Sequence, residues 1–374
     1  MNRILSFRRL RAMLVKETIQ MRRDRVTFAM MLGVPIMMLI LFGYAINTDP
    51  KHLPAALVAP TQDRYTRAIV TALELTGYYH FTDINVSADE ADKLLRRGDV
   101  SFVVTIPSDF DRRVDRGDSP TLLVEADATD PSVASGAVST LSTVAQQGLA
   151  FEQGTVAVPP GALNVIVHKL YNPEGITQYN IVPGLLGTIL QMTMVMMTAM
   201  GLTRETERGT MENLLAMPIS PLEIMLGKVL PFLAVGAVQM TVILIAAKVL
   251  FGVPFVGALW LLLSGVLIFV MALVLLGYSI STVAQSQMQA MQLSFFFFLP
   301  SILLSGFMFP YRGMPGWAQV LGEALPLTHF LRLVRAVMLK GAGLADVQST
   351  VLALIGFVVV FAGLALSRFR RTLD

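Results

Sequence analysis

The chain has 374 residues, of which 54% are hydrophobic and only 15% are charged, and its net charge is +3. This balance excludes an ordinary soluble globular protein and indicates a protein with several membrane-spanning segments. The absence of cysteine excludes disulfides, thiolate metal sites and a cysteine nucleophile.

Six apolar runs are long enough to cross a membrane, since about 20 helical residues span a hydrocarbon core of about 30 Å. The predicted transmembrane helices are residues 27–46, 181–202, 229–251, 259–284, 288–309 and 347–366. Lys248 is the only Lys, Arg, Asp or Glu within them, and near the end of its run it can reach the membrane surface. We therefore predict a polytopic α-helical membrane protein with six transmembrane helices.

The leader, residues 1–26, carries eight Lys or Arg side chains and two acids. Cytoplasmic flanks of membrane helices are rich in Lys and Arg, so the N-terminus is predicted to be cytoplasmic. Six crossings return the C-terminal tail, residues 367–374, to the same side, and this tail holds three arginines. Apolar leader residues three and four apart predict an amphipathic helix on the inner membrane surface, and a solvated basic tail is the alternative.

Residues 47–180 fall on the outer side and hold 10 basic and 17 acidic residues. The remaining basic charge lies in short segments beside the membrane, which indicates anionic lipids rather than nucleic acid as partners. Alternating patterns predict a small inserted α/β extracytoplasmic domain. Its expected elements are strands at 53–60, 100–107 and 121–127, helices at 64–79 and 89–98, and a long helix over 131–153 that leads back to the membrane.

No catalytic, cofactor-binding or metal-binding pattern is expected in this chain, because no HExxH, GxSxG or GxxxxGK[ST] sequence occurs in it. The missing phosphate loop has a direct consequence. If ATP drives the protein, the ATPase that binds ATP and Mg²⁺ must be another chain.

The cytoplasmic segment between the second and third spans, residues 203–228, contains an unusually dense polar block. Thr210 can cap a short helix, which carries Met211, Leu214 and Leu215 on one face and ends at Pro218. Asn213 stands where a capping box would have Glu or Gln, so the cap is imperfect. Such a helix can seat in a groove of a soluble partner, and an ordinary solvated loop is the alternative.

Two further features lie in the last third of the chain. Gln289 and Gln292 share one helical face and either line a pathway or subunit interface or take part in ordinary helix packing. Residues 310–342 are too charged to span, and they predict a re-entrant pair of helices at the outer leaflet, broken at Pro326. The polar and interfacial residues of this region are Trp317, Glu323, His329 and Arg332, and His329 is read as structural rather than as a proton relay.

The block RETERGTMENLLAMPISPLEIMLGKVLP resembles the signature of ABC transporter permeases of the type-2 exporter class. LVKETIQMRRDR, LYNPEGITQYNIVPGLLG and LPLTHFLRLVRAVMLKG resemble the same family in the same order, and the likeness covers nearly the whole chain. The segment TIPSDFDRRVDRGDSP is similar to the branch with a large extracytoplasmic domain, often described as multidrug efflux permeases.

This resemblance implies a permease subunit of an ATP-driven exporter of drugs or other amphiphilic compounds in a bacterial inner membrane. The implied partners are an ABC ATPase subunit, a second permease subunit and a periplasmic adaptor protein. By the same analogy the leader is a connecting helix, and the contacts to the ATPase come from Arg204, Glu205, Glu207, Arg208, Gly209, Thr210, Glu212, Leu214, Leu215 and Pro218.

Two alternative functions stay open at the level of the sequence. The same machinery could export a lipid-linked substrate, a polysaccharide or an ion. A protein of another class, a membrane receptor with an external ligand-binding domain, would have no ATPase partner.

Overall fold

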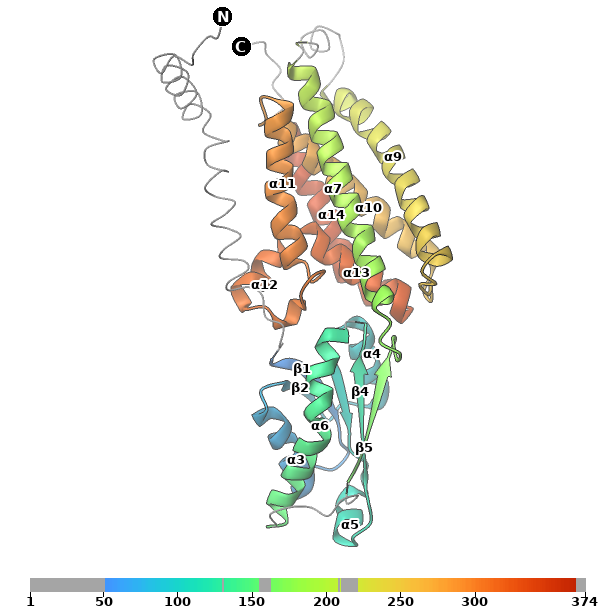
Figure 1. The fold of residues 1–374 in the computed structure, drawn as a ribbon, viewed down its shortest axis with the longest axis vertical. Helices are drawn as coiled ribbons and strands as arrows, with labels where there is room; N and C mark the ends of the chain where they lie inside the picture. Colours follow the sequence, from blue (N-terminus) through green and yellow to red (C-terminus); the bar gives the residue numbers. More distant parts are fainter. Residues whose placement is uncertain (1–50, 130, 155–162, 208, 210–220, 368–374) are drawn as a thin grey trace, which may run out of the picture.

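The computed structural model describes residues 51–129, 131–154, 163–207, 209 and 221–367. A sheet with covering helices, built from residues 53–170, lies at one end of a bundle of long helices (Figure 1). We call these two parts the sheet unit and the bundle. The predicted leader, the first predicted span and the C-terminal tail lie outside the described residues.

The sheet has five strands in the order β2-β1-β3-β4-β5. Neighbouring strands are parallel except β3 and β4, which pair antiparallel. The parallel pairs β1–β2 and β4–β5 are joined through helices, as parallel strands require. The strands are β1 (Leu53–Val58), β2 (Tyr79–Ile84), β3 (Phe102–Thr105), β4 (Thr121–Asp127) and β5 (Asn164–Leu170).

Helices cover both faces of this sheet. On one face α3 (Arg64–Leu75) and α6 (Pro131–Glu152) pack together over the alternate residues of β1 and β4 that point to that side. On the other face lies α4 (Ala88–Arg97), which Ser87 caps and Gly98 ends in a left-handed conformation with φ of 80°. The short helix α5 (Phe110–Asp115) forms the tip farthest from the bundle (Figure 1).

One expectation for this region is wrong. Instead of leading back to the membrane, α6 packs on α3, where a Cβ added to Gly148 would stand 2.9 Å from Cβ of Ala72. The chain then returns through β5, which lies at the edge of the sheet and leads into the bundle (Figure 1). A helix with small residues on one side can approach a neighbour closely, so its apolar composition reflects helix packing.

Within the described residues, the bundle contains five helices that are long and apolar enough to cross a membrane. They are α7 (Thr177–Glu207), α9 (Pro221–Val249), α10 (Leu259–Ser281), α11 (Gln287–Leu304) and α14 (Leu344–Ser367). At the centre, α10 packs against α7, α9 and α14, and most of its residues are buried. Ser286 caps α11, and the helix ends at Leu304, before the predicted end of that span, because Gly306 turns the chain with φ of 84°.

Two shorter helices lie where the bundle meets the sheet unit (Figure 1). After the single turn η2 (Tyr311–Gly313), α12 (Gly316–Glu323) and α13 (Pro326–Lys340) follow one another, and Pro326 occupies the first turn of α13. Nearly all apolar residues of α13 are buried against α7, α10 and α14. In particular, the rings of Phe330 and Phe269 stack with centroids 4.0 Å apart.

Candidate functional site: the α7–α11 face and the end of α7

The predicted coupling segment begins at the end of α7. This helix has 31 residues and is therefore about 46 Å long, which exceeds the about 30 Å of a hydrocarbon core. Its last turn carries the exposed side chains of Arg204 and Glu207 and the half-buried Glu205. Gly209 follows with φ of 70°, and its N–H donates to the carbonyl oxygen of Thr206 at 3.1 Å. The other predicted coupling residues, Arg208, Thr210, Glu212, Leu214, Leu215 and Pro218, lie outside the described residues.

A side-chain hydrogen bond joins the end of α7 to the start of α11. The amide Nε2 of Gln287 donates to Oε2 of Glu207 over 2.7 Å. Gln287 is the first residue of α11, so this hydrogen bond joins the last turn of α7 to the first turn of α11. The sequence analysis missed Gln287, since nothing in the sequence relates two residues 80 positions apart.

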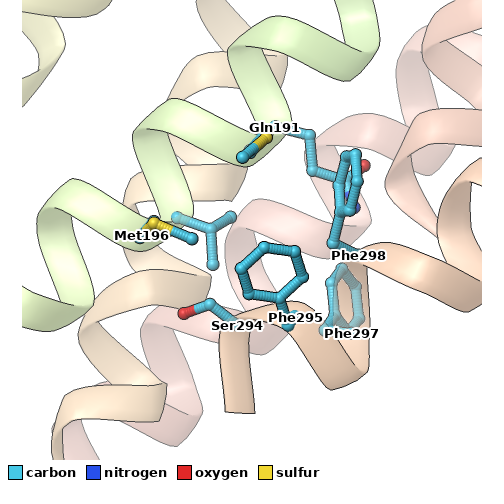
Figure 2. A pocket seen from close by; sticks show the side chains of 8 residues that line it. Gln191, Met196, Ser294, Phe295, Phe297 and Phe298 are labelled. Carbon is cyan, nitrogen blue, oxygen red and sulfur yellow. The ribbon is translucent and has the colours of Figure 1, made fainter. Parts of the chain in front are cut away.

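Farther along the same two helices, a buried amide faces a group of aromatic rings (Figure 2). Gln191 of α7 is only 1% exposed, and within the described part of the chain neither its Oε1 nor its Nε2 has a hydrogen-bond partner. A buried polar group without a partner costs about 1–3 kcal/mol. The surrounding side chains come from both helices and are Met192, Val195, Met196, Ser294, Phe295, Phe297 and Phe298.

The cavity beside Gln191 holds only about 10 Å³. That volume is near the minimum for one water molecule, whereas pockets for small ligands measure about 300–1,000 Å³. The wall of this cavity has polar and aromatic groups suited to an amphiphilic molecule. The cavity is too small for such a molecule, so α7 and α11 would have to separate to admit one. Gln191 was also missed, because a single amide within an apolar run gives no periodic signal.

The two glutamines predicted on α11 lie nearer its start. Oε1 of Gln289 accepts a hydrogen bond from the main-chain N–H of Gln285 at 2.9 Å, so this side chain helps to fix the loop before the helix. Gln292 is half-buried one turn farther on. Neither of them lines the cavity beside Gln191.

The polar residues predicted between Pro310 and Ala342 form a compact cluster around Glu323. Its carboxylate accepts hydrogen bonds from Arg332 at 2.5 Å and from the hydroxyl of Tyr311 at 2.7 Å. Nε2 of His329 lies 2.9 Å from the main-chain oxygen of Glu323, and because a carbonyl oxygen only accepts, this nitrogen carries the proton. Trp317 lies apart from the cluster with 43% of its surface exposed.

The cluster also changes the acidity of Glu323. Burial alone would raise the pKa of this carboxyl, but the hydrogen bonds from Arg332 and Tyr311 outweigh burial and hold the pKa below its usual value. Glu323 is therefore ionised at neutral pH, and the arrangement around it supports a structural role for His329. Tyr311 was absent from the sequence-based prediction because tyrosines are common near membrane surfaces.

Comparison with known proteins identifies the family of this chain. Residues 25–367 match the model of a family described as ABC-2 family transporter protein. The chain belongs to this family.

Three relatives of this ABC-2 family chain illustrate its similarity to known permeases. It is 31% identical to the probable multidrug ABC transporter permease YbhS of Escherichia coli K12 over 100% of both chains. It is 26% identical to the probable multidrug ABC transporter permease YbhR of the same strain, over 98% of this chain and 99% of the relative. Identity to the inner membrane transport permease YhhJ of that strain is 32%, over 77% and 78% of the two chains.

Proposed function

We propose that this ABC-2 permease is the membrane subunit of an ATP-driven exporter that moves drugs or other amphiphilic compounds out of the cytoplasm or inner leaflet. The names of the relatives YbhS and YbhR support the substrate class. The inner membrane of a bacterium is the proposed location, with both termini in the cytoplasm.

The proposed topology has six spans, with residues 27–46 joining the five described helices as the first. The sheet unit would then lie outside the membrane on the extracytoplasmic side. The proposed partners are a separate ABC ATPase subunit that binds ATP and Mg²⁺, a second permease subunit, membrane lipids and a periplasmic adaptor.

One observation carries the mechanism. The hydrogen bond between Glu207 and Gln287 ties together the cytoplasmic ends of the two helices that enclose Gln191. An ATPase that moved residues 203–228 would therefore displace α7 and α11 together and change the space between them. Under this proposal, the small cavity and the unpartnered amide of Gln191 would belong to the state before such a movement.

The test is ATP-dependent efflux of ethidium from liposomes that contain the permease and its ATPase. Glu207→Arg removes the acceptor for Gln287 and reverses the charge, and Gly209→Pro removes the N–H that closes the last turn of α7. Both variants should insert normally and lose at least about tenfold in efflux, which corresponds to about 1.4 kcal/mol of coupling free energy.

Glu152→Gln, an exposed acid in the sheet unit, is the control and should leave efflux unchanged. Wild-type efflux in both coupling variants would count against the mechanism. Purification of the native complex without any ATP-binding subunit would count against ATP-driven export as a whole.

A further inference from the structure

A second and much larger cavity lies where the sheet unit meets the bundle. It holds about 410 Å³, which is within the range of ligand pockets. Its walls come from the end of α4, the end of β4, the η2 turn, and helices α12, α13 and α14. The cavity is therefore formed only when the two parts of the molecule are together.

Positive charge dominates the walls of this junction cavity. Among the residues that the structure describes, five cationic side chains line it, against the two carboxylates of Asp99 and Asp127. The cationic residues are Arg97, Arg312, Arg332, Arg335 and Lys340. Four of these cations come from the bundle, and only Arg97 comes from the sheet unit.

Three of these cations have carboxylate partners in the structure. Lys340 lies 2.5 Å from Asp127, and both side chains are largely buried. Arg332 pairs with Glu323 at 2.5 Å, and Arg97 lies 3.4 Å from Asp346. The Lys340–Asp127 and Arg97–Asp346 pairs join the sheet unit to the bundle beside the cavity, whereas Arg332–Glu323 links α13 to α12 within the bundle.

Arg312 is different. Its guanidinium donates hydrogen bonds to the main-chain oxygens of Gly98 and Asp99, and no carboxylate of the described residues lies within ion-pair distance. Burial lowers the pKa of Arg312, and the nearby charge of Arg332 lowers it further. The charges of Asp127 and Asp99 offset this only in part, so an anion in the cavity would further stabilise the half-buried guanidinium.

The remaining polar groups of the wall suit an anion with several oxygens. Ser349 and Thr350 present hydroxyls from the first turns of α14, and Gln319 presents an amide from α12. Guanidinium groups bind phosphate oxygens with two parallel N–H bonds, which makes arginine the preferred residue for such recognition. Arg312 and Arg335 enter the cavity from two different elements, η2 and α13.

We propose that the junction cavity binds a phosphate group, supplied by the headgroup of a membrane phospholipid or by a soluble phosphate. The headgroup is the expected source if the sheet unit lies outside the membrane as proposed above, because the cavity then adjoins the outer membrane surface. The binding itself does not depend on ATP-driven export, and it is measured without the ATPase.

The experiment measures thermal unfolding of the purified full-length chain in detergent with three probes. These are inorganic phosphate at constant ionic strength, short-chain dihexanoyl phosphatidylglycerol, and dihexanoylglycerol, which lacks the phosphate. Dihexanoyl phosphatidylglycerol should raise the unfolding temperature, and dihexanoylglycerol should not. A shift with the phospholipid alone identifies a headgroup site, and a shift with both phosphate compounds identifies a general phosphate site.

Two pairs of variants test whether the shift comes from this cavity. Arg312→Gln should weaken binding at least about tenfold, whereas Arg116→Gln, an exposed arginine at the far tip of the sheet unit, should not. Ser349→Asp places a carboxylate in the wall and should abolish the shift without removing any cation, whereas Ser349→Asn should retain most of it.

The second pair keeps the proposal testable if Arg312→Gln fails to fold. Equal shifts in wild type and Ser349→Asp would overturn the proposal, as would equal shifts with the phospholipid and dihexanoylglycerol. If neither inorganic phosphate nor dihexanoyl phosphatidylglycerol raised the unfolding temperature, the proposal would be overturned as well. If the wild-type protein showed no ethidium efflux but kept the phosphate-dependent shift in unfolding temperature, the proposed export function alone would be rejected.

Discussion

Glycines set the closest helix contacts in the bundle. At Gly277 of α10, an added Cβ would stand 2.8 Å from the main-chain oxygen of Val195 and 2.8 Å from Cβ of Thr198 on α7. Main-chain atoms cannot move aside as the end of a long side chain can. Small residues at such crossings allow membrane helices to approach closely, and van der Waals contact then stabilises them.

Gly277→Ala should therefore destabilise the bundle by about 1–3 kcal/mol, because α10 and α7 must move apart. Thermal unfolding of the purified protein in detergent measures this effect. Gly356→Ala on α14 is the matched control, since an added Cβ meets nothing within 4 Å there. Equal unfolding temperatures for the two variants would show that the α7–α10 contact is more adaptable than its geometry indicates.

Glu323 gives the protein a predictable response to acid. Its pKa is lowered in the folded state, so the stability it contributes is present above the unfolded value of 4.5 and is lost as pH falls through the lower folded value. Glu323→Gln should therefore be less stable than wild type at neutral pH, and the difference should shrink below about pH 4.5.

Unfolding temperatures between pH 3 and 7 test this prediction. The difference between wild type and Glu323→Gln should depend on pH, whereas the difference for Glu152→Gln should be much smaller throughout. A constant difference for Glu323→Gln down to the lowest pH would mean that Arg332 and Tyr311 do not favour the ionised carboxylate.

Helix α13 packs against α7, α10 and α14 and buries its apolar residues there. Phe330 and Phe269 are fully buried and stacked, and Phe330 also lies against Gly187 of α7. In a membrane, lipid is as apolar as leucine, so the contribution of these rings comes from close contact rather than from transfer out of water.

Phe330→Ala should destabilise the folded protein by about 3 kcal/mol, because it leaves a cavity between α7, α10 and α13. The unfolding temperature in detergent measures the loss, and efflux should fall with the folded fraction. Phe151→Ala, at a site 85% exposed in the sheet unit, should change it little. A small effect at Phe330 would indicate that neighbouring side chains fill the space.

The sequence predicted some elements well, for identifiable reasons. The strand at Leu53 and the helix ending before Gly98 follow from a continuous apolar run and a terminating glycine. The edge strands β2 and β5 were missed, because both carry several polar residues, and only two side chains of β2 and none of β5 are buried.

The geometry of the candidate site was harder to predict from the sequence than the helices and strands were. The glutamine pair on α11 was noticed because its spacing is helical, but Gln191, Gln287 and Arg312 gain their meaning from residues far along the chain. The spacing of residues in the sequence predicts which side chains share one face of a helix. Only the packed structure shows which faces of different helices contact each other.

At the scale of the whole molecule, the proposed orientation can be tested directly. The chain has no cysteine, so a single introduced cysteine is the only thiol that a maleimide can label. Asp118→Cys, on the exposed tip of the sheet unit, should react with a membrane-impermeant maleimide in spheroplasts. Arg204→Cys, at the exposed end of α7, should react only after permeabilisation.

The reverse labelling pattern would place the sheet unit in the cytoplasm and would reject the proposed topology. Labelling of both sites before permeabilisation would mean that the membrane was not intact, and a cytoplasmic marker protein controls for this.

The tight contact between α7 and α11 also bears on the electrical insulation of the cell. A cavity of about 10 Å³ has no room for a hydrated ion, so the space between these two helices would not conduct ions in this arrangement. An exporter with a permanent channel wide enough for its substrate would let protons flow through it and would dissipate the proton gradient. By opening only when its two helices are pushed apart, the protein would confine that risk to the moment of transport.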